Sequence, residues 1–212
     1  MGKLIVIEGL DGAGKHTLAT ALVTALRSKG VTVAQRSFPR YGQDVHADLI
    51  HDGLHGRLGD LTDSVNGMAL LFALDRRAAA PRLRTELAET DVVLTDRYVA
   101  SNAAYGAARL RQGADGEFVE WVRALEIDRF GVPVPDAHIL LRVPSEVAAE
   151  RAQRREAGNA DRARDTYESN AELQADCARV YDQLAERGWL STWHVVDGSG
   201  DIDADSLVAM LI

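Results

Sequence analysis

The sequence predicts a three-layer α/β/α fold in which a five-stranded parallel sheet is surrounded by helices. Short apolar runs recur along the chain, bounded by turn or charged residues, and helix-period segments separate them. Strands that alternate with helices form parallel sheets, because each crossover helix covers a face of the sheet. The expected strands are 4–8, 31–38, 91–96, 137–143 and 193–196.

The helices follow from apolar periodicity and from stop signals. The first begins near Lys15 and ends near Lys29, where Gly30 provides the stop. Further helices are expected at about 62–88, 99–110, 117–130, 145–155, 165–187 and 203–212. Ligands of such folds bind beyond the carboxyl ends of the strands, so the segments after the strands are the candidate site regions.

Composition bounds the class of protein. The 212 residues suffice for one core, and we expect a single domain over 1–212. A net charge of −8 argues against nucleic-acid or anionic-membrane binding, and no apolar run approaches the roughly 18 residues that span a bilayer. The lone Cys177 has the helical spacing of a buried hydrophobic residue. We therefore expect a cytoplasmic protein.

The stretch GLDGAGKHT (9–17) matches the phosphate-binding pattern G-x-x-x-x-G-K-[ST] except at its last place. Its glycines allow positive φ, so that backbone N–H groups surround a phosphate at a helix N-terminus, and Lys15 adds a compact charge. The alternative is a tight strand-to-helix turn. The residues expected to bind a nucleotide's phosphates are Gly12, Ala13, Gly14, Lys15, His16 and Thr17.

His16 stands where the pattern has a hydroxyl, and Thr17 comes one place late. Imidazole is a poor ligand for Mg²⁺, which prefers oxygen. We favour a solvent-facing His16 over a protonated one that adds charge near the phosphates, because an unperturbed histidine is mostly neutral at pH 7. Magnesium then needs carboxylates. Asp11 is one candidate, although an acid in a glycine-rich turn can also serve only to stabilise the turn. Because its negative charge lies in a phosphate-binding loop, Asp11 should face a cation or a hydroxyl.

Two stretches predict an acceptor side. FPRYGQ (38–43) follows the second strand, where Phe38, Arg40 and Tyr41 face a second substrate; alone it is a weak signal. In DRYVASNAAY (96–105), Asp96 has the position of a Walker-B-type acid, and the fork of Arg97 suits a phosphate. The one-face spacing of Asn102, Tyr105 and Arg109 also fits a merely solvated helix face.

LLFALDRRAAA (70–80) places Phe72 and Arg76 one helical turn apart. The ring can stack on a nucleobase while the guanidinium donates to a base carbonyl. A core phenylalanine covered by an arginine stem has the same pattern, and the pattern alone does not choose between the two.

RAQRREAGNADRAR (151–164) carries five arginines in fourteen residues. We expect an Arg-rich lid at about 150–164, which neutralises charge during phosphoryl transfer; a solvated helical hairpin is the alternative. DTYE (165–168) follows, where Asp165 and Glu168 have capping-box spacing. Both are also candidates for the missing magnesium ligand.

Assembled, these stretches make the chain similar to the thymidylate kinase family, above all to its mycobacterial-type branch. EGLDGAGKHTL, FPRYGQ, LFALDR, DRYVASNAAY and RARDTYE carry the resemblance from end to end. It implies a P-loop nucleoside monophosphate kinase that transfers the γ-phosphoryl group of ATP to dTMP, requires Mg²⁺ and forms a homodimer. In that branch an arginine stands in place of His16. Because histidine is shorter and not always charged, we expect Lys15 and the lid to supply more of the positive charge near the ATP phosphates.

The resemblance also assigns roles. It implies that Phe72 stacks on thymine, that Arg76 and Asn102 bind the base, and that Tyr105 occupies the ribose 2′ side. By the same resemblance, Arg97 binds the acceptor phosphate, and Asp11 lies near the 3′-hydroxyl and the metal. Arg151 and Arg155 correspond to the lid arginines. Contacts to nucleotide or metal are implied for Asp165, Tyr167 and Glu168.

The expected mechanism is in-line displacement without a strong general base, because a phosphate monoester is largely dianionic at pH 7. Charge compensation then falls to Lys15, Arg97, Arg155 and Arg151. Two alternatives stay open at this point. One is a kinase for another nucleoside monophosphate such as dUMP, and the other is a regulatory protein that binds ATP without turnover.

Overall fold

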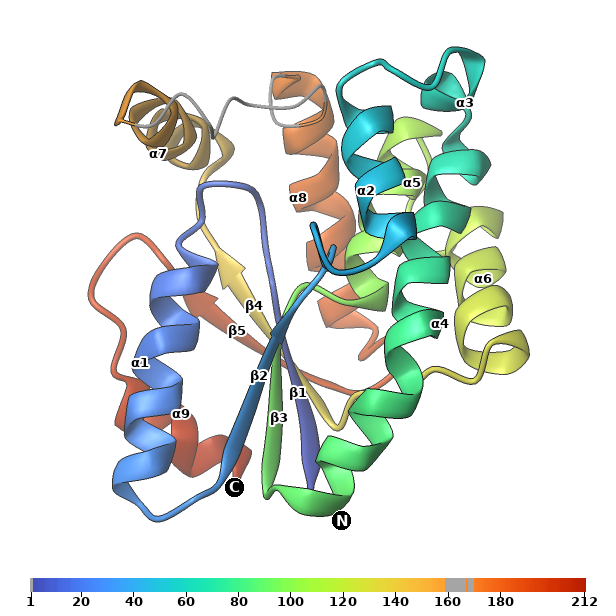
Figure 1. Cartoon of the computed structure of the whole chain (residues 1–212). Coiled ribbons are helices and arrows are strands. Elements are labelled where there is room, and N and C mark those ends of the chain that lie inside the picture. Colours follow the sequence, from blue (N-terminus) through green and yellow to red (C-terminus); the bar gives the residue numbers. More distant parts are fainter. Residues whose placement is uncertain (1, 159–166, 168–169) are drawn as a thin grey trace.

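The structure, a computed structural model, describes residues 2–158, 167 and 170–212, without the side chains of 155–158. Its sheet has five parallel strands in the order β2-β3-β1-β4-β5, which confirms the predicted fold class (Figure 1). The strands are β1 (Lys3–Glu8), β2 (Val33–Ser37), β3 (Val92–Asp96), β4 (Ala137–Arg142) and β5 (Thr192–Asp197).

Helices cover both faces of this sheet. Figure 1 shows α1 and α9 on one face and α4, α5 and α8 on the other. Covered faces explain why the central strand β1 is apolar and buried from Leu4 to Ile7. The helices are α1 (Lys15–Ser28), α2 (Val45–Leu54), α3 (Asp60–Asp63), α4 (Val65–Glu89), α5 (Val99–Arg109), α6 (Glu117–Arg123), the π-helical η1 (Ala124–Arg129), α7 (Ser145–Gly158), α8 (Ala171–Glu186) and α9 (Ala204–Leu211).

Two helix predictions were wrong. The sequence analysis left 45–54 without a helix, yet α2 forms there behind Asp44, whose side chain accepts from the His46 N–H. The helix expected from 165 begins only at Ala171, where the Asn170 side chain caps it by accepting from Leu173. Tyr167 consequently lies in a turn before α8 and is available to the site.

The core is apolar and continuous around the sheet. Cys177 is buried on α8 beside Leu173, Tyr181 and Leu184, as predicted from their spacing. No helix among the described residues is both long and apolar enough to cross a membrane.

A buried histidine makes the core sensitive to acid. His138 on β4 is fully buried, its Nδ1 lies 2.7 Å from Ser191 Oγ, and its ring stacks on Trp193 at 4.3 Å. Burial lowers the pKa of His138 from 6.5 to about 3. Between about pH 6.5 and 3, His138 is therefore protonated in the unfolded chain but neutral in the folded chain. The free energy of unfolding falls as the pH drops through this range.

We expect this one residue to lower the free energy of unfolding by about 2 kcal/mol between neutral pH and about pH 5. Urea unfolding at both pH values checks it, with His138→Phe as the comparison. The variant should have a shallower dependence on pH than the parent, whatever its absolute stability. Equal slopes in the two proteins would contradict the assignment.

Candidate active site

A cavity of about 720 Å³ opens beyond the carboxyl ends of the strands. Most of the predicted site residues line it: Asp11, Gly12, Gly14, Lys15, His16, Thr17, Phe38, Tyr41, Phe72, Arg76, Arg97, Asn102, Tyr105, Arg151 and Tyr167. Ala13 and Arg40 do not line it. Asp165, Glu168 and the side chain of Arg155 lie outside the described residues.

The loop between β1 and α1 has the backbone of an anion cradle. Gly12 and Gly14 have φ of 81° and 101°, and no side chain in the described part of the chain caps the N-terminus of α1, so its N–H groups are available to a ligand. A Cβ on Gly12 would lie 2.1 Å from the Ala148 carbonyl oxygen. Glycine is therefore required here because α7, the first part of the predicted lid, packs directly on the loop.

Lys15 lies at the floor of the cradle and is only 8% exposed. Its Nζ donates to the carbonyl oxygens of Leu10 at 2.8 Å and Gly9 at 3.2 Å, and it lies 4.0 Å from an Asp11 oxygen. Burial lowers the pKa of Lys15, and Arg97 lowers it further, while Asp11 and other carboxylates oppose this change. His16, the next residue, is exposed on the first turn of α1, in line with the solvent-facing interpretation.

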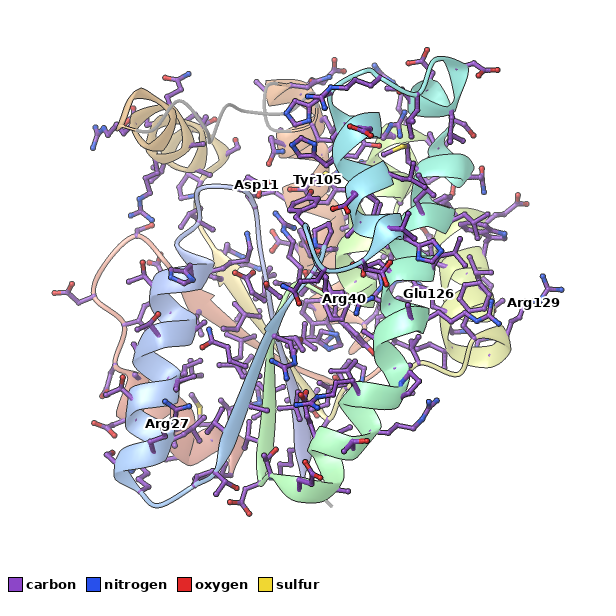
Figure 2. The ribbon with its side chains drawn as sticks, in the orientation of Figure 1. Asp11, Arg27, Arg40, Tyr105, Glu126 and Arg129 are labelled. Carbon is purple, nitrogen blue, oxygen red and sulfur yellow. The ribbon has the colours of Figure 1, made fainter. Side chains whose placement is uncertain are left out.

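Asp11 accepts hydrogen bonds from two residues that also line the cavity. Arg97 Nη2 donates to one Asp11 oxygen at 2.5 Å, and the Tyr105 hydroxyl donates to the other at 2.8 Å. Figure 2 shows Asp11 and Tyr105 next to each other above the sheet. Burial raises the pKa of Asp11, but the charges of Arg97 and Lys15 outweigh it and hold that pKa well below its usual range. The cation and hydroxyl that the sequence analysis required are both present.

Arg97 has a strained backbone. It follows β3 with φ of 64°, a left-handed conformation that is uncommon for a residue with a side chain. Such strain persists where the surroundings hold it, and the Arg97 N–H donates to Ile7 at 2.9 Å. Burial lowers the pKa of the guanidinium, but Asp11 more than compensates, so that the pKa lies well above its ordinary value. Arg97 is thus a fixed, permanent cation between the loop and α5.

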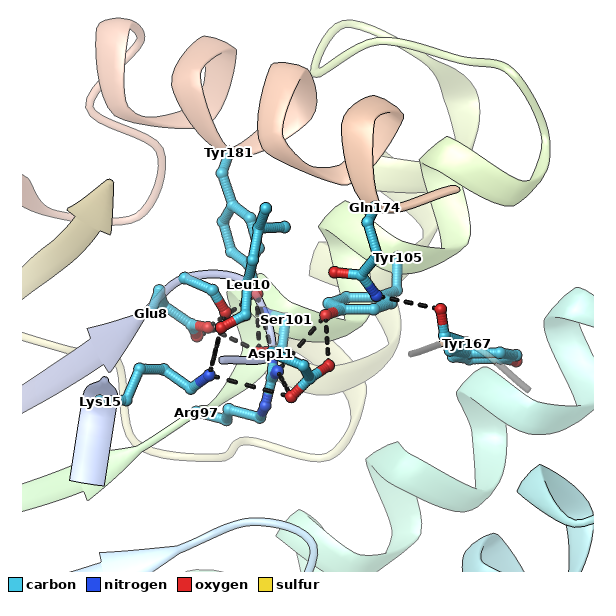
Figure 3. A network of polar contacts seen from close by, with 11 residues as sticks. Glu8, Leu10, Asp11, Lys15, Arg97, Ser101, Tyr105, Tyr167, Gln174 and Tyr181 are labelled. Atoms are coloured by element: carbon cyan, nitrogen blue, oxygen red, sulfur yellow. Dashed lines mark hydrogen bonds and ion pairs between the residues drawn. The ribbon is translucent and has the colours of Figure 1, made fainter. Parts of the chain in front are cut away.

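A second layer of polar residues holds this cation, and the sequence analysis missed it (Figure 3). Buried Glu8 accepts from Ser101 Oγ at 2.6 Å and from the Tyr181 hydroxyl at 3.0 Å. Arg97 Nη1 in turn donates to Ser101 at 3.0 Å and Tyr181 at 3.4 Å. Burial raises the pKa of Glu8, an effect that these hydrogen bonds and Arg97 oppose.

The opposite wall of the cavity has the features of a base pocket. Phe72 is half-buried against Ile50, Leu54 and Met68 and also lines the cavity. Arg76 donates to buried Glu126 through Nε at 2.5 Å and Nη2 at 2.7 Å. Asn102 Nδ2 donates to the same carboxylate at 2.8 Å. The sequence analysis did not single out Glu126.

Arg40 does not face the cavity. Its Nε donates to Asp75 at 2.7 Å and its Nη2 donates to Asp44 at 2.8 Å, which ties the segment after β2 to α4. Its neighbours Phe38 and Tyr41 do line the cavity. The charge of Arg40 is therefore compensated within the protein, and its side chain shapes this segment.

Tyr167 and Arg109 close the side of the cavity near the lid. The Arg109 guanidinium lies over the Tyr167 ring, 5.0 Å from its centroid, and donates to the Tyr167 hydroxyl and to the Asp63 carbonyl. The Tyr105 ring stacks on the Tyr167 ring, with the two centroids 6.1 Å apart. Arg109 is therefore more than part of a solvated helix face, which was its alternative interpretation.

Arg151 of α7 reaches the phosphate loop. Its Nη1 donates to the Gly198 carbonyl at 3.0 Å and the Ala13 carbonyl at 3.3 Å, and it lines the cavity. Ala13 thus contributes its backbone to the contact between lid and loop.

The cavity also offers an oxygen ligand for a hard cation. Asp96 lines it at the end of β3, and its Oδ1 is buried without a hydrogen-bond partner among the described residues. A carboxylate oxygen in this condition fits Mg²⁺. Asp11, by contrast, already accepts from Arg97 and Tyr105. The described residues hold no group of three or more acidic, histidine or cysteine side chains placed for a metal, so any further ligands must come from substrate, water or residues outside this part.

Comparisons with known proteins agree with this geometry. The family model described as "Thymidylate kinase" matches residues 7–204. "Thymidylate kinase" of Mycobacterium tuberculosis (strain ATCC 25618 / H37Rv) is 50% identical over 208 residues, which is 98% of this chain and 96% of that protein. "Probable thymidylate kinase" of Thermococcus onnurineus is 33% identical over 187 residues, 86% of this chain and 84% of the relative. "Thymidylate kinase" of Caenorhabditis elegans is 30% identical over 212 residues, 96% and 86% of the two chains.

Proposed function

Because the chain belongs to the thymidylate kinase family and therefore phosphorylates dTMP to dTDP with ATP, we propose that the cavity binds both nucleotides and is where transfer occurs. One observation carries this proposal. A single cavity is lined by the glycine loop with Lys15, by Phe72 and Asn102, and by Arg97, which contacts Asp11 of the loop. A donor phosphate on the loop and an acceptor phosphate on Arg97 then share one cavity.

On the donor side, the loop N–H groups and Lys15 bind the ATP phosphates. A lysine that already lies on two carbonyl oxygens is close to its working position, and its compact charge suits the β- and γ-phosphates. Arg151, which donates to the Ala13 carbonyl, is the described lid arginine best placed to add charge, and Arg155 is the second candidate. His16 and Thr17 border this end of the cavity.

On the acceptor side, thymine stacks on Phe72 and meets Arg76 and Asn102, while Arg97 binds the dTMP phosphate. Asp11 and Tyr105 contact the sugar, the tyrosine on the 2′ side. Their hydrogen bond at 2.8 Å supports a closed sugar subsite that has little room for an additional hydroxyl. Phe38, Tyr41 and Tyr167 complete the lining, and Arg40 supports it from behind. We also assign Asp165, which lies outside the described residues, to the nucleotide.

The reaction is an in-line displacement. An oxygen of the largely dianionic dTMP phosphate attacks the γ-phosphorus of ATP, the bond from that phosphorus to the bridging oxygen breaks, and ADP leaves with the electron pair. The protein abstracts no proton in this step. Its contribution is to align the two phosphates and to place Lys15, Arg97 and a lid arginine where negative charge accumulates.

Kinases of this family generally require magnesium, and we propose that Asp96 is a ligand, with Asp11 and Glu168 as further ligands once dTMP and ATP are bound. The bound cation would neutralise charge on the β- and γ-phosphates. The unpartnered oxygen of Asp96 supports this choice.

We also propose that the chain is one domain over 1–212 with its lid at about 150–164, and that it works as a homodimer in the cytoplasm. Large apolar side chains are exposed on three adjoining helices, Val45 and Leu49 on α2, Leu61 on α3 and Leu70 on α4. Such a patch suits a second copy of the chain. Sedimentation velocity distinguishes a dimer from a monomer.

The test of the proposed site is ADP release with dTMP, dUMP, dCMP and dGMP as acceptors. Turnover should be fastest with dTMP, and Phe72→Ala should raise the KM for dTMP by about tenfold or more without changing the KM for ATP. Phe118→Ala, which truncates a core phenylalanine outside the cavity, is the matched control. If Phe72→Ala keeps the parent's KM for dTMP, the base binds elsewhere.

A further inference from the structure

Glu126 is a buried carboxylate that does not line the cavity but touches two residues that do. It is 0% exposed, on the π-helical turn η1, and Figure 2 shows it among the helices on the side of α4. Its oxygens accept three hydrogen bonds, two from Arg76 and one from Asn102. A buried charge is costly unless it is fully paired, and here the pairing partners are the expected base-binding residues.

Glu126 determines which end of the Asn102 amide faces the cavity. Asn102 Nδ2 donates one hydrogen to Glu126 Oε1 at 2.8 Å and the other to the Ala69 carbonyl at 3.0 Å. Both partners only accept, so the amide cannot be reversed without placing oxygen against oxygen. Its Oδ1 makes no hydrogen bond with the described residues and is left as an acceptor on the cavity wall.

The same carboxylate determines which N–H groups of Arg76 remain available to a ligand. Nε and Nη2 both donate to Glu126, and Arg76 is only 2% exposed. Among the described residues no partner is found for Nη1, which can only donate. The wall therefore carries an acceptor from Asn102 beside a donor from Arg76.

We propose that Glu126 is a positioning residue that sets the hydrogen-bond polarity of the base pocket and thereby selects the imide edge of thymine or uracil over cytosine. An imide presents a ring N–H beside a carbonyl, which matches acceptor beside donor. Cytosine presents a ring nitrogen acceptor beside an amino donor, so both contacts would be mismatched. The inference rests on the proposed function, because it assumes that the base binds at Arg76 and Asn102.

Glu126→Gln tests this assignment, because glutamine keeps the shape but turns one acceptor into a donor. Its new NH₂ group must replace either the oxygen that accepts from Asn102 Nδ2 and Arg76 Nη2 or the oxygen that accepts from Arg76 Nε, so a donor faces a donor in both orientations. Asn102 and Arg76 are then no longer held by a shared acceptor, and the fixed polarity of the wall is lost. The measurement is kcat/KM for dTMP and for dCMP in parent and variant. We expect the dTMP-to-dCMP ratio to fall at least about tenfold through KM, with kcat and the KM for ATP unchanged.

Glu86→Gln is the matched control. Glu86, on α4, is likewise a buried carboxylate; it pairs with two arginines, Arg36 and Arg82, and none of these three residues lines the cavity. This variant is expected to lose stability and to keep the parent's ratio. A Glu126→Gln enzyme with the parent's ratio would overturn the role of Glu126 alone. A parent enzyme without preference for dTMP would overturn the proposed base site as well.

A second measurement does not depend on the Glu126 variant. In the parent protein, NMR exchange of the Asn102 side-chain amide should be at least about tenfold slower than that of exposed Asn66, because both Asn102 hydrogens are bonded to buried acceptors. The assignment of Asn102 comes from a spectrum of Asn102→Ser. Exchange as fast as that of Asn66 would overturn the fixed amide and the proposal with it.

Discussion

Lys15→Ala is expected to lower kcat by about a thousandfold or more while the fold stays intact. Among the residues that the structure describes, its ammonium bonds only to the loop carbonyls and lies near Asp11, so no other contact there explains its burial. Without Lys15, the negative charge that develops on the transferring phosphoryl group is stabilised by the loop N–H groups and the arginines but no longer by the ammonium group. His16 does not take the place of Lys15, because its side chain is exposed on the first turn of α1 and not buried in the cradle.

Steady-state ADP release at saturating ATP and dTMP measures the effect of Lys15→Ala. Lys29→Ala is the control, because Lys29 is an exposed lysine at the far end of α1 whose carboxylate partner, Asp205, lies 3.8 Å away on the surface. It should leave kcat unchanged. Turnover of Lys15→Ala within about tenfold of the parent would remove this lysine from the chemistry.

Arg97→Ala is expected to lower kcat/KM for dTMP by about a thousandfold, with a much smaller effect on the KM for ATP. The guanidinium lies between the loop and α5 with its orientation fixed by Ser101, Tyr181 and Asp11. Its loss also leaves half-buried Asp11 without its main cation, so a carboxylate would face the incoming phosphate. Both effects weaken binding of the acceptor phosphate.

Kinetics with dTMP varied at fixed ATP measure this loss. The control is Arg142→Ala, which removes an arginine that pairs with Asp182 at the surface and lies outside the cavity. Should Arg97→Ala weaken ATP and dTMP equally, Arg97 would serve the site as a whole and not the acceptor phosphate.

The sequence predicted the parts of the site that depend on local patterns. The strand followed by Gly9, Gly12, Gly14 and Lys15 is a contiguous signal, and the positive φ angles of these glycines are properties of the loop itself. The strand end at Asp96 and Arg97 is equally local. The sheet order then brings these two segments together, because β1 pairs with β3.

What the sequence did not predict is the layer of residues behind the cavity. Glu126 meets Arg76 and Asn102 across sequence separations of 50 and 24 residues, and no periodicity identifies such a contact. Glu8 and Tyr181 are similar, since Glu8 is the last residue of an apolar strand and Tyr181 has the spacing of a core residue on α8. Both are in fact buried, but they are buried as hydrogen-bonding groups.

Arg40 illustrates the opposite case. A basic residue after a strand predicts an anion contact, yet Asp75 and Asp44 already pair with it. Asp75 lies 35 residues further along the chain, beyond α2 and α3, so the pairing could be recognised only from the folded structure.

The most direct test of a shared cavity is a crystal structure with dTMP, Mg²⁺ and a non-hydrolysable ATP analogue. The account predicts thymine on Phe72 beside Asn102, the acceptor phosphate on Arg97, and the γ-phosphate on Lys15 in line with it. A dTMP molecule bound away from Phe72 and Arg97, with the two phosphates facing apart, would contradict it.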